Sequence, residues 1–367
     1  MLMYWIFLGA QSAMAMFEQS TQQPRRRFDA VWMVFGACLA MFIGLRWKTG
    51  GDWGNYYRNL DAFYWVGPTA TVAPSTDALF TLLQMFAALF PTGIVVVTLF
   101  SGIVMTVALI RFSLDQPRPW LCMTVAFPYL VVVCGMGYIR QGIAISLLLL
   151  GLVALRKGKV ITYTLWAIAA ALFHSTAVAM VPLGAIASGR RQLVSGAFIT
   201  TLLILAFGSL LRERADTMFV SYVEAELSSS GALVRAFMNA LPAAVFLLFR
   251  KNFGLSSSYQ LAWTLLAVAA VVQVPATLLY ASTTVIDRLG LYLLPIQCFI
   301  WSRVPDALAS NKQQRVLLGT GIVCLYLVVF FTFIVFGDNA FAWKPYRFYL
   351  FEDGLCPECG GFNDRET

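Results

Sequence analysis

Charged side chains are scarce in this chain: aspartate, glutamate, lysine and arginine make up 12% of its 367 residues. An average soluble domain contains about 25% of these residue types. Apolar residues make up 59% of the chain, and apolar runs close to the ~20 residues that cross a bilayer recur along its whole length. The composition excludes a water-soluble domain and predicts an all-α polytopic membrane protein, with residues 1–367 forming one integral membrane domain.

Motifs for metals and cofactors are also lacking. The chain contains one histidine, and it has no glycine-rich phosphate loop, nucleophile elbow or His-Glu metal motif. Cys356 and Cys359 form a lone C-x-x-C pair without the second pair that a zinc site needs. An outer-side disulfide and two free thiols are both open for this pair. We therefore expect no cofactor and no metal ion.

The apolar segments predict about 11–12 transmembrane helices. The segments are residues 1–17, 28–45, 93–111, 119–137, 139–155, 160–174, 175–188, 193–211, 231–250, 258–281, 286–302 and 315–337. The sixth and seventh are short for full crossings, so a tight or partial helical hairpin is the alternative. Residues 78–90 predict an interfacial or re-entrant helix on the outer side, and 212–230 predict an amphipathic helix on the same surface.

Positive charge is distributed unevenly between the loops. If the N-terminus lies outside and residues at segment edges are assigned to the nearer side, alternate loops hold 15 of the 26 lysines and arginines but only 4 of the 18 acidic residues. Those loops are residues 18–27, 112–118, 156–159, 189–192, 251–257 and 303–314. Cytoplasmic loops carry such an excess of positive charge, so both termini are predicted to lie on the outer side. The net charge of +8 thus reports orientation, and we expect no nucleic-acid partner.

A polar stretch from Arg46 to Arg58 follows the second segment on the predicted outer side. Gly50 and Gly51 can adopt backbone conformations closed to other residues, so they can present Asp52 on a tight turn. The aromatic residues of the stretch suit both the membrane–water interface and the stacking of sugar rings. These aromatic residues are Trp47, Trp53, Tyr56 and Tyr57.

Further polar residues lie at predicted outer boundaries far along the chain. Arg140 opens the fifth segment, His174 lies between the two short segments, and Arg288 opens the eleventh segment beside Asp287. Arg347 follows the last segment. Each residue has an ordinary explanation, as a snorkelling arginine, a packing histidine, a surface ion pair or a polar tail. Their shared side of the membrane favours a functional explanation, because ionisable residues at a membrane boundary need a partner or water.

The combination of side chains indicates a chemistry. Arginines bind phosphate oxygens through paired hydrogen bonds and stay charged in partly dry surroundings. A carboxylate such as Asp52, or an imidazole such as His174, can accept a proton from a sugar hydroxyl. Several guanidinium groups with one base suit a pyrophosphate leaving group and a hydroxyl nucleophile. A glycosyltransferase acting outside the cell, where no nucleotide sugar is available, would use such a lipid-linked pyrophosphate donor.

The sequence resembles the EpsG family of bacterial polysaccharide-repeat polymerases, which are Wzy-type proteins. The resemblance runs from end to end and rests on short motifs in a fixed order. These are Arg46 with Gly51-Asp52 and Tyr56, Arg140-Gln141-Gly142-Ile143-Ala144, Phe173-His174-Ser175-Thr176-Ala177, Arg288 with Tyr292, and Pro345-Tyr346-Arg347. The short sixth and seventh segments and the C-x-x-C pair depart from the family pattern.

The resemblance implies a GT-C-like bundle in the bacterial inner membrane, with its active site facing the periplasm. The substrates would be undecaprenyl-pyrophosphate-linked glycans, as both donor and acceptor. A chain-length regulator and a flippase are candidate partners beside the lipid bilayer. On both lines of reasoning, Arg140 and Arg288 are the first candidates to bind the donor pyrophosphate, and Asp52 is the first candidate for the general base, with His174 second. The further substrate-binding candidates are Arg46, Arg347, Gln141, Tyr56 and Tyr346.

Three other functions fit the same composition. A flippase or transporter of lipid-linked oligosaccharides would place its polar residues near the middle of the bilayer, often in two related halves. An O-antigen ligase-type glycosyltransferase would use similar chemistry with another acceptor. A non-catalytic scaffold of a polysaccharide export complex would need none of these residues for catalysis.

Overall fold

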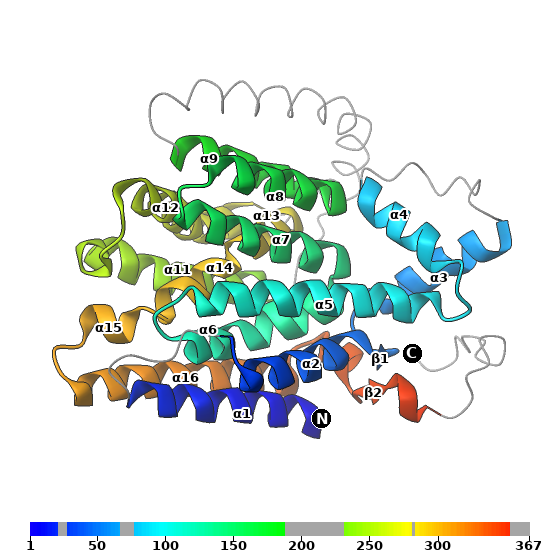
Figure 1. The fold of residues 1–367 in the computed structure, drawn as a ribbon, viewed down its shortest axis with the longest axis horizontal. Coiled ribbons are helices and arrows are strands. Elements are labelled where there is room, and N and C mark those ends of the chain that lie inside the picture. The colour runs from blue at the N-terminus through cyan, green and yellow to red at the C-terminus, as the bar shows by residue number, and fades with distance from the viewer. Residues whose placement is uncertain (21–27, 67–76, 188–230, 281–282, 353–367) are drawn as a thin grey trace.

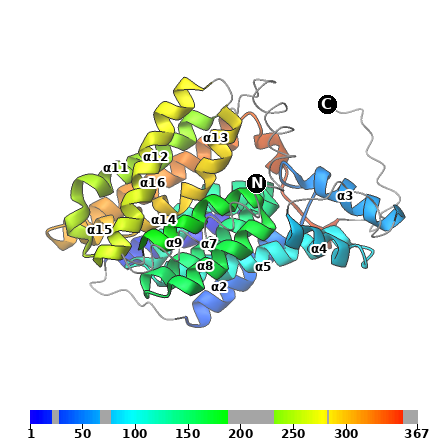
Figure 2. The same ribbon diagram turned by 90° about the horizontal axis from the view of Figure 1, so that it is seen from above.

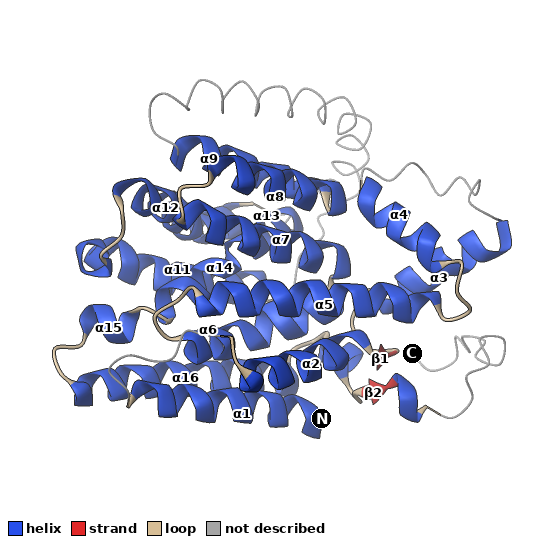
Figure 3. Ribbon diagram, viewed as in Figure 1, coloured by secondary structure: helices blue, strands red, loops and turns tan. Residues whose placement is uncertain are grey.

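The structure is a computed structural model that describes residues 1–20, 28–66, 77–187, 231–280 and 283–352. The regular secondary structure of the described residues is helical apart from one short β-ladder of two residues in each strand, which the sequence did not predict (Figure 3). Within these described ranges, seven helical segments are long and apolar enough to cross a membrane. The all-α membrane fold is therefore confirmed, and its helices make this a multi-pass membrane protein.

The long segments agree closely with the hydropathy pattern. They are α5 (Gly93–Leu114), α6 (Pro119–Ala126) with the π-helical η1 (Phe127–Gly137), α7 (Ile139–Arg156), α11 (Ala232–Phe249) with η4 (Arg250–Phe253), α12 (Ser257–Leu279), the α13 (Thr283–Gly290), η5 (Leu291–Leu293) and α14 (Leu294–Trp301) unit, and α16 (Lys312–Phe336). Each begins and ends within a few residues of its predicted segment. The predicted segment 193–211 and the amphipathic helix 212–230 lie outside the described residues, as do Cys356 and Cys359.

The remaining helices are shorter or less apolar. They are α1 (Leu2–Gln19), α2 (Ala30–Gly44), α3 (Trp53–Val66), α4 (Ala78–Ala87), α8 (Val160–Phe173), η2 (Ser175–Met180), α9 (Val181–Ala187), α15 (Val304–Leu308), η6 (Ala340–Trp343) and η7 (Tyr349–Phe351). The helices α1 and α2 fill the places of the first two predicted segments. The predicted interfacial helix 78–90 corresponds to α4, which projects with α3 beyond the end of α5 (Figures 1 and 2).

The helices α8, η2 and α9 form the hairpin that the two short segments allowed. The hydroxyl of Tyr163 in α8 donates to the Met180 carbonyl oxygen at 2.6 Å. Gly184 in α9 lies against the Tyr163 ring, where a Cβ would meet the ring carbons. His174, with extended backbone torsions, is the residue at which the chain turns from α8 into η2.

The helix α6 with η1 lies at the centre of the bundle and is buried along its whole length. By contrast, only about a third of the apolar part of α16 is buried against the protein. Rings pack closely around α6 and α14, as the stacked pairs Trp32–Trp120 and Trp263–Phe299 show, with centroids 4.0 and 3.7 Å apart. Close packing of this kind holds membrane helices together, because lipid tails are as apolar as the side chains themselves.

The long axes of the helices run roughly parallel in Figure 1, so the bundle has two ends. One end carries β1 (Arg46–Trp47), which pairs antiparallel with β2 (Arg347–Phe348); we call it the β1 end. At the opposite end, Arg118 pairs with Asp306 at 2.6 Å and Arg156 with Asp115 at 2.6 Å. Three loops predicted to share one side of the membrane thus meet at one end, and the compartment that each end faces stays a prediction.

Candidate functional site

Asp52 lies on a tight turn at the β1 end, between β1 and α3. The turn depends on Gly50, whose φ of +110° favours glycine and whose position leaves no room for a Cβ against the Met136 carbonyl oxygen. The Gly50 N–H donates to the Ala342 carbonyl oxygen at 2.8 Å, and the Asp52 N–H donates to Gly137 at 3.3 Å. These bonds fix Asp52 against η1, as the Gly-Gly-Asp sequence suggested.

The side chain of Arg46 stabilises this turn. Its side chain is 1% exposed and donates to three backbone carbonyl oxygens: Thr49 at 3.1 Å, Met136 at 2.9 Å and Ile43. A buried guanidinium saturated by carbonyls has little surface left for a ligand. Arg46 is among the predicted pyrophosphate-binding residues. In the structure its guanidinium joins α2, the turn and η1 through these hydrogen bonds.

The carboxyl group of Asp52 is surrounded by positive charge. Burial raises its pKa above the usual value, while the charges of Arg288, Arg140 and His174 lower it, and burial outweighs them. Within the described residues the Asp52 carboxylate accepts no hydrogen bond, so its oxygens are available to a ligand. The structure thus brings together the four residues that sequence reasoning ranked first.

Arg140 stands at the start of α7 and points toward α4. Its Nη1 donates to Oδ2 of Asp77 at 2.8 Å, and its charge lies close enough to Tyr56 of α3 to lower the pKa of that hydroxyl, which burial raises. Its guanidinium carbon lies 6.0 Å from the centre of the Phe80 ring. The side chain is still 36% exposed, so Arg140 is held in place and can also contact a ligand. Tyr56 is buried and acts here as a support for Arg140.

Asp77 is the residue at this site that the sequence prediction missed. It is 1% exposed and precedes the first residue of α4, yet its side chain makes no capping bond to that helix. Its carboxylate accepts instead from Arg140 and from the Ser175 N–H at 2.9 Å. The sequence does place an aspartate directly before a predicted outer-side helix, where aspartate is common as a capping residue. That position could have marked Asp77 as a further polar residue on the outer side.

Charge and hydrogen bonds keep Asp77 ionised. Burial alone raises its pKa, but the neighbouring His174, the charge of Arg140 and the Ser175 N–H together lower the pKa below the usual value. Oδ2 of Asp77 lies 3.5 Å from Nδ1 of His174, whose side chain is 12% exposed. His174 is therefore at the site and faces a carboxylate.

Arg288 reaches the site from α13, and its backbone is held by Gln141. The Gln141 Nε2 donates to the Arg288 carbonyl oxygen at 2.6 Å, and Gln141 is 4% exposed. The Gln141 amide thus holds α13 in position, and substrate binding by Gln141 stays a prediction. Next to it, the hydroxyls of Thr176 and Tyr292 lie 3.0 Å apart and tie η2 to η5.

The neighbour of Arg288 in the chain, Asp287, pairs with another helix. Arg235 of α11 contacts both carboxylate oxygens of Asp287, at 2.6 and 2.8 Å, and both side chains are mostly buried. This ion pair joins α11 to α13 and so fixes the part of α13 that carries Arg288. The sequence suggested a local pair between Asp287 and Arg288 and did not point to Arg235.

A second polar cluster lies deeper in the bundle, below α13. Asn239 donates to Gln273 at 3.2 Å and to the Gly290 carbonyl oxygen at 3.0 Å, and it accepts from Gln297 at 2.7 Å. Tyr326 donates to Gln297 at 2.6 Å. These buried groups satisfy one another, as groups at membrane depth must, and they stabilise the helix break at η5.

The last two candidates lie on the strand side of the β1 end. The Tyr346 hydroxyl donates to the Phe42 carbonyl oxygen at 2.9 Å, and its ring stacks on Phe42. Arg347 is exposed on β2, opposite Trp47. Tyr346 thus anchors β2 to α2, and Arg347 is the more accessible of the two residues.

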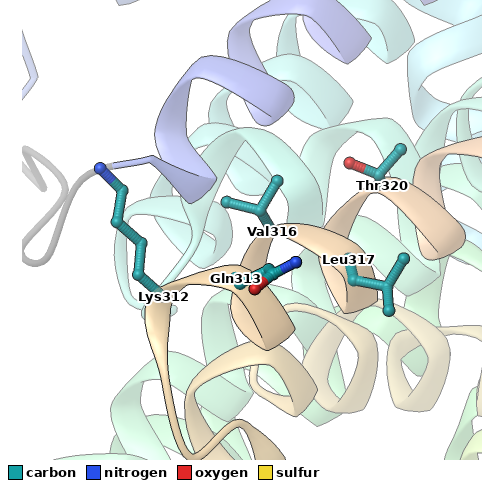
Figure 4. A pocket seen from close by; sticks show the side chains of 5 residues that line it. All are labelled: Lys312, Gln313, Val316, Leu317 and Thr320. Carbon is teal, nitrogen blue, oxygen red and sulfur yellow. The ribbon is translucent and has the colours of Figure 1, made fainter.

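A shallow groove of about 560 Å³ lies at the other end of the molecule, on α16 (Figure 4). Its lining is almost wholly apolar and includes Val316 and Leu317, with Lys312 at its edge. It contains none of the charged residues of the β1 end. In the described part of the chain, no three His, Cys, Asp or Glu side chains are grouped so that they could share a metal ion.

The model of the EpsG family matches residues 29–348, which is most of the chain and includes every residue of the site. This chain belongs to the EpsG family. The EpsG family is linked to polysaccharide synthesis. The charged residues at the β1 end therefore belong to a membrane protein of a family with that link. No curated protein and no solved structure matches the chain.

Proposed function

We propose that this EpsG-family protein is a polysaccharide polymerase that joins glycan units carried on undecaprenyl pyrophosphate. The observation that carries the proposal is the meeting of Arg140, Arg288, Asp52 and His174 at one end of the bundle. Two arginines supply charge for a pyrophosphate, and a half-buried carboxylate without a hydrogen bond supplies a base. This is the outer end in the predicted orientation, where lipid-linked donors are available.

The reaction transfers the growing glycan from its lipid carrier to a new lipid-linked unit. A hydroxyl of the acceptor sugar attacks the anomeric carbon of the donor, and the bond from that carbon to the pyrophosphate oxygen breaks. The hydroxyl proton passes to the Asp52 carboxylate, and undecaprenyl pyrophosphate leaves with the bonding electron pair. Because burial raises the pKa of Asp52, its carboxylate is a stronger base than an exposed one.

The arginines act on the leaving group. Negative charge grows on the pyrophosphate oxygen as the glycosidic bond breaks, and guanidinium groups already fixed in place stabilise that charge without reorganising. Arg140 is fixed by Asp77, and the backbone of Arg288 is fixed by Gln141. In its neutral form, His174 is the alternative proton acceptor in the same site.

Alanine substitution tests this assignment. In cells that depend on this protein, we expect R140A, R288A and D52A, at normal protein level, to lose long polysaccharide chains on gels, and H174A to be reduced or inactive. Arg58 is exposed on α3, where its bond is local, to Asn55, so R58A is the matched control and should keep long chains. Long chains of normal length in all four site variants would refute the proposal.

A further inference from the structure

The proposed function leaves Asp77 without a part in the reaction, although its carboxylate contacts two elements of the site and faces a third residue there. Its carboxylate accepts from Arg140 of α7 at 2.8 Å and from the first N–H of η2 at 2.9 Å, and it faces His174 at 3.5 Å. At 1% exposure, Asp77 is shielded from the acceptor sugar, and its oxygens are already occupied. It is therefore poorly placed to be the base itself.

The helix to which Asp77 belongs gains little from its side chain. Aspartate before the first turn of a helix usually accepts from that helix's own N–H groups, which is worth about 1 kcal/mol. Asp29 does so for α2, where its Oδ1 accepts from Val31 and Trp32. Asp77 makes no such bond to α4 and turns its carboxylate toward α7 and η2, so its side chain serves these elements.

We propose that Asp77 is a positioning residue, which orients the Arg140 guanidinium toward the lipid-linked pyrophosphate and fixes the chain turn that carries His174. A guanidinium has five N–H donors in a rigid plane. When one edge is held by Asp77, the plane of Arg140 is fixed while 36% of the side chain stays exposed. The bond to the Ser175 N–H fixes the backbone next to His174 in the same way.

This inference rests on the proposed function and is tested by kinetics on protein reconstituted in proteoliposomes. The probe is an undecaprenyl-pyrophosphate-linked oligosaccharide, and the readout is KM and kcat for release of undecaprenyl pyrophosphate. We expect D77N to raise KM about tenfold, which corresponds to ~1.4 kcal/mol, and to lower kcat, while D77E, which keeps the carboxylate, loses less. D29N, which alters an aspartate at a helix start remote from the site, should match wild type.

The decisive comparison is made in an R140Q background. If Asp77 acts through Arg140, D77N adds less than about threefold to the KM of R140Q, since residues acting as a unit are not additive. A full tenfold addition, or wild-type KM and kcat for D77N, would overturn the positioning role while the proposed function stands. Should D77N fail to fold, D77E is carried through the same cycle. Wild-type protein that forms no polymer would overturn the proposed function and this role with it.

Discussion

The sequence made Arg140 a first candidate and Arg46 a further candidate for binding the donor, and substitution by methionine should now separate their roles. The Arg46 guanidinium donates to three backbone carbonyls and is buried. A hydrogen bond from a charged group contributes about 1.5–3 kcal/mol. Methionine would leave three carbonyls partly unsatisfied, so we expect R46M to lose about 3–5 kcal/mol of stability, as when one partner of a buried pair is removed.

The measurement is thermal unfolding of the purified protein in detergent, followed by tryptophan fluorescence, beside the polysaccharide assay. For R46M we expect a melting temperature lower by about 5–10 °C. R140M, which removes a side chain that is one-third exposed, should melt close to wild type and yet form no long chains. R58M is the control for an arginine at the surface. An R46M protein that melts like wild type but forms no polymer would refute the structural role and return Arg46 to the substrate-binding residues.

Three further predictions concern the turn and its neighbours. The rate of polymerisation should rise with pH, because the ionised form of Asp52 is the base. The midpoint of that rise should lie above the usual aspartate pKa of ~3.9, since burial raises the pKa of Asp52. A rate independent of pH from 4 to 8 would argue against Asp52. Q141L should lower the rate at least tenfold with little loss of melting temperature, because it frees the Arg288 backbone; a wild-type rate would show that this bond is dispensable. G50A should reduce folded protein, because its Cβ would collide with the Met136 carbonyl oxygen. G321A, which adds a Cβ in open space on α16, should have a much smaller effect when both are measured by size-exclusion yield.

Hydropathy predicted the helices well because lipid imposes a simple rule on length and composition. The segment 139–155 became α7 (Ile139–Arg156), and 160–174 with 175–188 became the hairpin of α8, η2 and α9. The outer-side charge pattern was enough to bring Asp52, Arg140, His174 and Arg288 into one hypothesis, and the structure places them together.

The roles inside the site could not be predicted, because they depend on contacts between distant parts of the chain. Asp77 meets Arg140 across 63 residues, and Arg235 meets Asp287 across 52. The sequence around Arg46 does not indicate that backbone carbonyl groups of α2 and η1 surround its guanidinium. Such pairings follow from helix packing, which hydropathy does not encode.

The most direct test of the central claim is synthesis by the purified protein alone. Proteoliposomes containing only this chain and undecaprenyl-pyrophosphate-linked oligosaccharide should form glycans of several units and release one undecaprenyl pyrophosphate for each bond made. Protein carrying R140A and R288A should bind less donor and release none. Movement of the lipid-linked oligosaccharide across the bilayer without any new glycosidic bond would contradict the account and identify a transporter.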